Sequence, residues 1–290
     1  RFRLRFGRRR KRNTITSYQQ QQQEQDEMEV SLEEMTSKNP ANTSNKQKDD
    51  PTILSRNDKS KLERRKKIYD NYSDTAKSLL LELANLVHAL TFQNGSDDEI
   101  TICIHQWIVT RNTTSKYLFK LLRNSIHIPQ YACLLAFFYH YSIGTRFNSR
   151  KTLKYYQLAA NMGDSFAANQ TGICYAWSIG VEKCDLQMEI RYYRISAELG
   201  HPQGQSNLAH AIRRGIVHEF CDKREALFWY LKATDTGYPA ASWYVADCYK
   251  NGCGTMVDYH KMLIWYTKYL KKQNVAISLN FLINNKLFDV

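Results

Sequence analysis

The amino-acid sequence predicts an all-α protein that is built from stacked pairs of helices. Three observations lead to this prediction. Aromatic pairs, small residues and glycines recur every 36 or 37 residues through the second half of the chain. Apolar residues before this region follow the i, i+3/i+4, i+7 spacing of amphipathic helices. No segment of useful length alternates apolar and polar residues as a half-buried β-strand would.

The first 59 residues are predicted to be a disordered arm that is basic at its start and rich in glutamine. They contain three aromatic residues and the run Gln19–Gln23, so they cannot bury enough apolar surface to offset the entropy of ordering the backbone. Residues 1–12 hold eight basic side chains and no acidic one. The run Arg8–Arg12 is either a solvated tail, a nuclear-import signal, or a contact to phosphate or an anionic membrane.

Charge and cysteine usage exclude several classes of protein. The formal charge is +13, but residues 68–290 carry 23 basic and 18 acidic groups, which argues against a nucleic-acid-binding body. Contact with nucleic acid or an anionic membrane is therefore expected only through residues 1–12. The seven cysteines form no C-x-x-C pair, so neither zinc nor a disulfide framework is predicted. Reduced thiols fit a cytoplasmic protein, or a nuclear one if Arg8–Arg12 acts as an import signal.

Residues 60–129 are predicted to form an N-terminal helical segment that packs on the repeats. Leucines and valine between Leu79 and Leu90 lie on one helical stripe, so a helix is expected to end near Phe92, before Asn94-Gly95. Ser96 followed by acidic residues is typical of a helix start. A further helix is expected to begin near Thr114.

Each repeat is predicted to be a helix, a glycine-containing turn and a second helix that ends at another glycine. Repeat units begin near Tyr131, Ala167, Gly204 and Ala241, and a fifth, incomplete unit (Ala276 to Asn285) is expected to cap the stack. A single unit cannot bury its apolar face alone, so neighbouring units should stack into a solenoid. The second helices carry the aromatic pairs Tyr155-Tyr156, Tyr192-Tyr193, Trp229-Tyr230 and Trp265-Tyr266, and the helix-capping types Asn148, Asp185, Asp222 and Asp258.

Residues 130–290 resemble the Sel-one-like repeat, a relative of the tetratricopeptide repeat. The resemblance is carried by the pattern A-x-x-x-L-G-x-x-Y-x-x-G-x-G followed by D-x-x-x-A-x-x-Y-Y-x-x-A-A-x-x-G, which Val245 to Gly254 match best. The third repeat departs from it, with Ile212 in place of the tyrosine and Val217 in place of a glycine. The resemblance implies a right-handed α-α superhelix of four repeats plus a C-terminal capping helix.

The resemblance also implies where a partner would bind. In tetratricopeptide-like units the first helix of each repeat lines the concave face, which holds a protein or peptide partner. Arg213, Arg214 and Lys250 would form a cationic patch that suits an acidic partner. The alternative interpretation of these side chains is packing and a solvated face. The concave positions that this resemblance implies are His140, Tyr141, Asn169, Trp177, Ser206, His210, Arg213, Arg214, Trp243, Asp247, Lys250 and Asn251.

The function predicted from the sequence is that of a monomeric, non-catalytic scaffold or adaptor without a cofactor or a small-molecule substrate. Gly252-Cys-Gly254 lacks the third glycine of a dinucleotide-binding loop and follows a helix. Cys103 and His105 are two of the four ligands that a zinc site needs. The alternative is the C-terminal regulatory part of a signalling enzyme, such as a protein kinase, whose catalytic domain would lie upstream of Arg1. The sequence itself contains no kinase motif.

Overall fold

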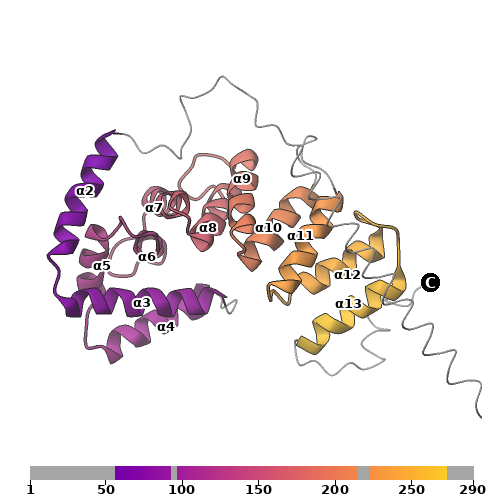
Figure 1. Cartoon of the computed structure of the whole chain (residues 1–290), viewed down its shortest axis with the longest axis horizontal. Coiled ribbons are helices and arrows are strands. Elements are labelled where there is room, and N and C mark those ends of the chain that lie inside the picture. Colours follow the sequence, from indigo (N-terminus) through magenta and orange to yellow (C-terminus); the bar gives the residue numbers. More distant parts are fainter. Residues whose placement is uncertain (1–55, 93–96, 215–222, 273–290) are drawn as a thin grey trace, which may run out of the picture. The chain divides into compact units, whose positions relative to one another are not determined.

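The computed structural model describes residues 56–92, 97–214 and 223–272, and within these ranges every regular element is an α-helix (Figure 1). The all-α prediction is therefore confirmed. Residues 1–55 of the predicted arm, the fifth unit, Ser96, Asp222 and Val217 lie outside the described residues. Residues 56–59, which were predicted as the disordered end of the arm, are helical instead. The helices are α2 (Arg56–Asp70), α3 (Asp74–Phe92), α4 (Asp97–Thr110), α5 (Ser115–Asn124), α6 (Pro129–His140), α7 (Ser149–Asn161), α8 (Ser165–Ala176), α9 (Leu186–Glu198), α10 (Pro202–Arg213), α11 (Lys223–Asp235), α12 (Ala241–Asn251) and α13 (Tyr259–Lys272).

Helices α2 to α5 precede the repeats and pack on one another, and α3 and α5 also pack on α6. The helical conformation is interrupted between α2 and α3, at residues 71–73. There the hydroxyl of Tyr72 donates to the carbonyl oxygen of Leu121 and accepts from Nδ2 of Asn124, which ties the break to α5. Thr114 caps α5 by accepting from the backbone N–H of Tyr117 at 3.2 Å. Helix α2 begins four residues before the predicted boundary at residue 60.

The repeats are four consecutive helix pairs, α6–α7, α8–α9, α10–α11 and α12–α13. Each helix packs against the next one in the sequence, and the first helices α8 and α10 also contact each other. The leucine position of each first helix holds Leu135, Thr171, Leu208 or Val245, and all four side chains are buried. The second helices begin as predicted, since Asn148, Asp185 and Asp258 each accept a hydrogen bond from the backbone N–H three residues later.

The first three aromatic pairs occupy equivalent, buried places in successive repeats, and the fourth pair, Trp265-Tyr266, is partly buried. Tyr156, Tyr193 and Tyr230 are all buried. In the first repeat Tyr139 stacks on Tyr155, with ring centroids 5.7 Å apart, and in the second repeat Tyr175 and Tyr192 stack at 5.8 Å. The aromatic rings thus fill the space between the two helices of these units.

Turn glycines allow close backbone approach between neighbouring repeats. A Cβ on Gly180 would lie 2.5 Å from the carbonyl oxygen of Ser149, the first residue of α7, and a Cβ on Gly254 would lie 2.1 Å from that of Lys223, the first residue of α11. Gly144 makes the same approach to Ser115, the first residue of α5. Helix α5 therefore holds the place that a second helix of a preceding repeat would hold, and it extends the stack towards the N-terminus.

Candidate functional site

Each first helix has one face that carries exposed or partly exposed side chains in repeats two to four. This face consists of four positions spaced i, i+4, i+7 and i+11, which fall on one side of an α-helix. We call this set of positions the stripe. Its members are Gln130, Leu134, Phe137 and Tyr141 for α6; Phe166, Gln170, Ile173 and Trp177 for α8; Gln203, Asn207, His210 and Arg214 for α10; and Ala240, Tyr244, Asp247 and Asn251 for α12.

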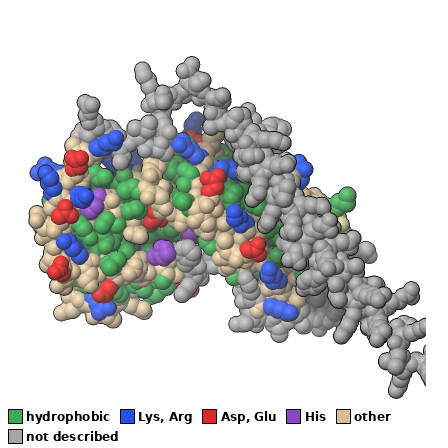
Figure 2. Space-filling view, viewed as in Figure 1, with side chains coloured by type: hydrophobic (Ala, Val, Ile, Leu, Met, Phe, Trp, Pro, Cys, Tyr) green, Lys and Arg blue, Asp and Glu red, His purple; other side chains and the backbone are tan. Residues whose placement is uncertain are grey.

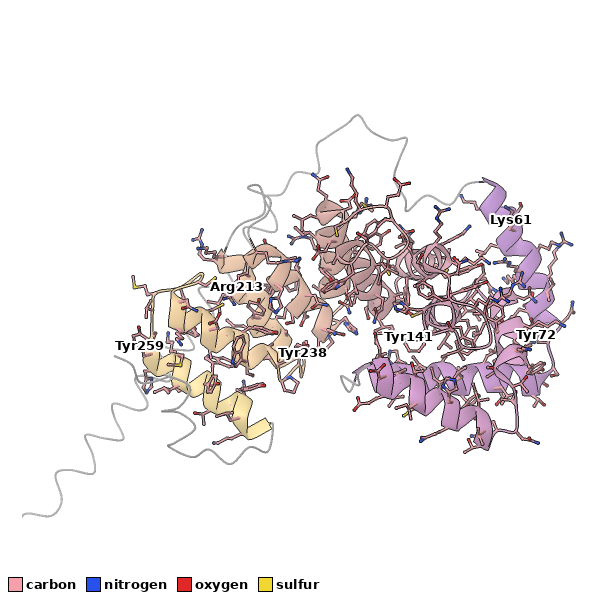
Figure 3. The ribbon with its side chains drawn as sticks, turned by 180° about the vertical axis from the view of Figure 1, so that it is seen from behind. Lys61, Tyr72, Tyr141, Arg213, Tyr238 and Tyr259 are labelled. Atoms are coloured by element: carbon pink, nitrogen blue, oxygen red, sulfur yellow. The ribbon has the colours of Figure 1, made fainter. Side chains whose placement is uncertain are left out.

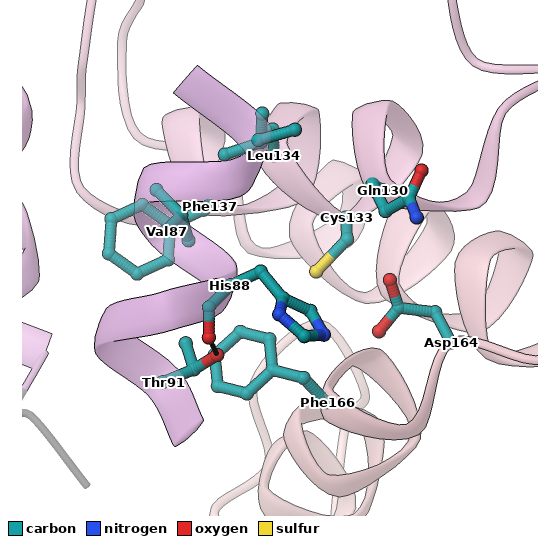
Figure 4. Close-up of a pocket in the computed structure, with 10 residues that line it drawn as sticks. Val87, His88, Thr91, Gln130, Cys133, Leu134, Phe137, Asp164 and Phe166 are labelled. Atoms are coloured by element: carbon teal, nitrogen blue, oxygen red, sulfur yellow. Dashed lines mark hydrogen bonds between the residues drawn. The ribbon is translucent and has the colours of Figure 1, made fainter. Parts of the chain in front are cut away.

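Helix α3 covers most of the stripe of the first repeat. It packs on α6, and Leu134 and Phe137 are buried. Between the helices lies a cavity of about 30 Å³, bounded also by Asp164 and Phe166 at the start of α8 (Figure 4). That volume holds one or two water molecules and no metabolite. The residues that line it from α3 and α6 are Ala84, Val87, His88, Thr91, Gln130, Cys133, Leu134 and Phe137.

The last stripe residue of the first repeat is bound to α4. The hydroxyl of Tyr141 donates a hydrogen bond to the Oδ2 atom of Asp97, the first residue of α4, and Figure 3 shows Tyr141 beside the helices α3 and α4. Burial and the neighbouring Asp97 carboxylate raise the pKa of Tyr141, so its proton stays in place to make this bond. The contact joins residues 44 positions apart in the chain.

Replacing Tyr141 by Phe removes this bond and keeps the ring. We expect the variant to lose about 1–3 kcal/mol of stability, because Asp97 loses a hydrogen bond to its charged carboxylate. Amide hydrogen exchange should accelerate in α3 and α4 and stay unchanged in α12. Exchange that accelerates equally in all helices would contradict the assignment of Tyr141 as the contact that holds α4 on the first repeat.

Repeats two to four leave much of the stripe accessible. Trp177 is 75% exposed, and Arg214 and Asn251 are exposed as well. We call the accessible members of these three repeats the open stripe. They are Ile173, Trp177, Gln203, Asn207, His210, Arg214, Ala240, Tyr244, Asp247 and Asn251.

Two residues predicted on the concave face, Asn169 and Ser206, are buried instead. Nδ2 of Asn169 donates to Oε1 of Gln203 at 3.4 Å, and Oδ1 of Asn169 accepts from Nδ2 of Asn207 at 2.8 Å. Asn169 therefore connects the first helices α8 and α10. Trp243 holds the equivalent position in α12 and is 40% exposed, since no later first helix within the described residues covers it.

The predicted cationic patch is largely neutralised by carboxylates. Arg213 forms an ion pair with Asp247 of the next repeat, and Arg214 forms one with Glu189. The Glu189 carboxylate is almost fully buried; this burial raises its pKa, and the guanidinium of Arg214 opposes that shift. Asn251 donates to Oδ1 of Asp247 at 2.7 Å. Lys250 is exposed and takes part in none of these pairs.

The two histidines of the predicted set are half-buried and neutral at physiological pH. His210 lies edge-on to the rings of Tyr244 and Tyr230, with centroids 4.2 and 5.4 Å away. Burial, and then the charges of Arg213 and Arg214, lower the pKa of His210 to about 4. His140 stacks on Tyr141 at 4.5 Å, and burial lowers its pKa as well.

The sequence prediction did not include Gln203, Asn207 and Tyr244. It placed some of the concave-face residues one position before the corresponding stripe residue of the same helix. Six residues of the predicted set coincide with stripe positions, and their role in binding a partner stays a prediction: Tyr141, Trp177, His210, Arg214, Asp247 and Asn251. The sequence does contain a pattern that indicates which side of each first helix carries the stripe. The small residue after the leucine position must face the second helix, so a stripe residue lies one position before the leucine and not two.

Burial raises the pKa of the thiols of Cys133, Cys174 and Cys248, which disfavours the nucleophilic thiolate. Nδ1 of His105 lies 2.8 Å from the carbonyl oxygen of Thr101. Within the ranges that the structure describes, no three side chains of His, Cys, Asp or Glu are grouped as a metal site requires.

Figure 2 shows basic and acidic side chains interspersed over the described part of one face. None of the described helices combines the length and the apolar content that a membrane crossing needs.

Comparison with known protein families identifies the repeats. The Sel1 repeat matches residues 129–164, 165–201, 202–238 and 239–268. Residues 129–268 are four Sel1 repeats. Each match begins two residues before the start that the sequence periodicity predicts, so the recognition of the repeat is confirmed. The Sel1 repeats contain the whole of the stripe, and helices α2 to α5 precede them.

Solved structures share the fold of the Sel1 repeats. A Sel1 repeat protein from Oxalobacter formigenes superposes with a TM-score of 0.52 and 18% identity, covering 66% of this chain and 83% of its own. The protein c5321, a protective antigen of uropathogenic Escherichia coli strains with an SLR fold, superposes with a TM-score of 0.54 and 20% identity. That alignment covers 73% of this chain and 48% of c5321. No curated protein matches the sequence significantly.

Proposed function

We propose that the protein is a non-catalytic adaptor that binds a partner protein across the open stripe of α8, α10 and α12. Sel1-repeat proteins act in general as scaffolds for protein interactions. The open stripe supports this proposal because it combines two exposed or half-buried aromatic rings, Trp177 and Tyr244, with amide and charged side chains. Aromatic anchors beside polar groups are typical of protein interfaces.

The observation that carries the proposal is that another helix of the chain covers the stripe of the first repeat. There the stripe residues Leu134 and Phe137 are covered by α3, a helix of the same chain. Of the equivalent positions in the next three repeats, Gln170 is buried, and the others remain partly accessible: Ile173, Asn207, His210, Tyr244 and Asp247. A surface that buries one polypeptide segment in the first repeat, and that continues uncovered along the stack, is suited to bury a second segment.

The cationic side chains near the open stripe indicate where an acidic group of the partner would bind. Because Arg213 and Arg214 are paired with carboxylates, an acidic partner would meet Lys250 first, and it would gain the arginines only by displacing Asp247 or Glu189. We therefore propose a partner whose acidic groups, if present, lie near α12. A strongly acidic segment along the whole stripe is not required.

Site-specific photocrosslinking tests the adaptor function. A photoreactive benzoylphenylalanine at position 207 or 251 of the full-length protein should crosslink a discrete protein in an extract of the source cells. The same group at Lys154 or Glu198, which are exposed on the second helices α7 and α9, serves as the control. Crosslinks from the control positions alone, or no protein product from positions 207 and 251, would contradict the proposed function.

A further inference from the structure

The open stripe carries side-chain amides that retain hydrogen-bonding capacity. Asn207 donates through Nδ2 to Asn169, and its Oδ1 makes no further hydrogen bond among the described residues. Gln203 accepts at Oε1 from Asn169, which leaves its Nε2 donors to a ligand. Asn251 donates through Nδ2 to Asp247, which leaves its Oδ1 acceptor. An amide can both donate and accept, as a peptide group does.

The types of side chain on the stripe differ between the first repeat, where α3 covers them, and the later repeats, where they are accessible. In the first repeat the two buried stripe residues are apolar, Leu134 and Phe137, and they hold the helix α3. The residues of α3 at this contact are Ala84, Val87, His88 and Thr91, which are spaced i, i+3, i+4 and i+7 as one helical face. In the third repeat the corresponding stripe residues are Asn207 and His210. The accessible part of the stripe thus combines amide, charged and histidine side chains with apolar or aromatic ones, namely Ile173, Trp177, Ala240 and Tyr244.

A helical ligand cannot use these amides through its backbone. Inside a helix, backbone N–H and C=O groups bond to each other, whereas an extended segment leaves them free for partners. We propose, building on the adaptor function, that the open stripe binds an extended segment of its partner, whose peptide groups hydrogen-bond to Gln203, Asn207 and Asn251. Trp177 and Tyr244 flank these amides and contact the side chains of the segment.

The length of the segment follows from the helices that are accessible. Neighbouring packed helices lie about 8–10 Å apart, so three first helices present roughly 20–30 Å of surface. An extended chain advances about 3.3 Å per residue and covers this distance with about 6–9 residues. A helix advances 1.5 Å per residue and would need about 13–20 residues. Helix α3, which reaches the start of α8, closes the stripe at one end.

Selection of linear peptides on the full-length protein tests this inference. The probe is a display library of random twenty-residue linear peptides, and the affinity of the enriched peptides is measured for the natural protein and for variants. Asn207→Leu and Asn251→Leu should each weaken binding about three- to tenfold, as expected for losing one or two hydrogen bonds. Lys154→Leu, on α7, should leave binding unchanged. Because Asn207 also supports the buried Asn169, Asn251→Leu at an exposed position guards against an effect of unfolding.

Truncation and backbone changes of the enriched peptides separate an extended from a helical ligand. Affinity should be retained down to a core of about 6–9 residues, and methylation of single backbone nitrogens should weaken binding at alternate positions. A required core of about 13–20 residues, with proline tolerated nowhere inside it, would overturn the extended segment while preserving the adaptor function. Failure to enrich any peptide, or enriched peptides that bind Asn207→Leu and Asn251→Leu unchanged, would overturn both.

Discussion

Replacing Gly172 by Val should destabilise the protein by about 3 kcal/mol, the upper end of the usual cost of overpacking a core. Gly172 lies in α8 where Cβ would be 2.5 Å from both Cδ1 and Cε1 of the Tyr193 ring in α9. Tyr193 is itself buried, so its ring has no free space to enter. For a protein of this size the thermal midpoint should fall by roughly 6–12 °C, which calorimetry or far-UV circular dichroism can measure.

Two comparisons separate packing from other effects at this position. Ala136, Ala209 and Ala246 occupy the equivalent place in the other repeats and are buried, so a Cβ is compatible with the fold wherever the facing ring is placed differently. Ala176→Val, at a half-buried position of the same helix, controls for the lower helix propensity of valine. A thermal midpoint for Gly172→Val equal to that of Ala176→Val would refute the predicted contact.

The second large effect is loss of stability in mild acid. His201 is 1% exposed and precedes α10, where its Nδ1 accepts from the backbone N–H of Gly204 at 3.2 Å. Burial, and to a lesser degree the charge of His88, lower the pKa of His201 to about 4. An unfolded chain titrates histidine near pH 6.5, so between about pH 6.5 and pH 4 the unfolded state binds a proton that the folded state does not. The free energy of unfolding therefore decreases as the pH falls through this range.

The decrease should reach about 3 kcal/mol for His201 alone near pH 4, and His210, whose pKa is also about 4, should add to it. Urea denaturation at a series of pH values measures the change. Asn caps helices well and does not titrate in this range, so His201→Asn should unfold similarly to the natural protein at pH 7.5 and show a shallower decrease towards pH 4. An identical pH dependence for the two proteins would show that His201 does not couple folding to protonation.

The repeat spacing and most helix starts could be predicted from the sequence because they depend on local chemistry. Asn148, Asp185 and Asp258 cap their helices through hydrogen bonds to residues three positions away, and glycine marks the turns. The docking of α3 on α6 could not be predicted in the same way, because it joins segments about 50 residues apart. One signal was present: nine consecutive apolar residues from Tyr131 to Tyr139 are all buried, and a helix that is apolar on every side must be covered on every side.

For the candidate site too, some properties could be predicted from the sequence and others depended on tertiary structure. The types of residue on the stripe, including the aromatic rings and the amides, are determined by the sequence and its period. Whether a given residue is available was decided only by tertiary contacts. Asn169 is buried in the interface between α8 and α10, and Arg213 forms an ion pair with Asp247. In the first repeat, α3 packs on the stripe. A repeat pattern reports the angle at which a side chain leaves its helix, and the elements that fold back onto that helix decide what the side chain contacts.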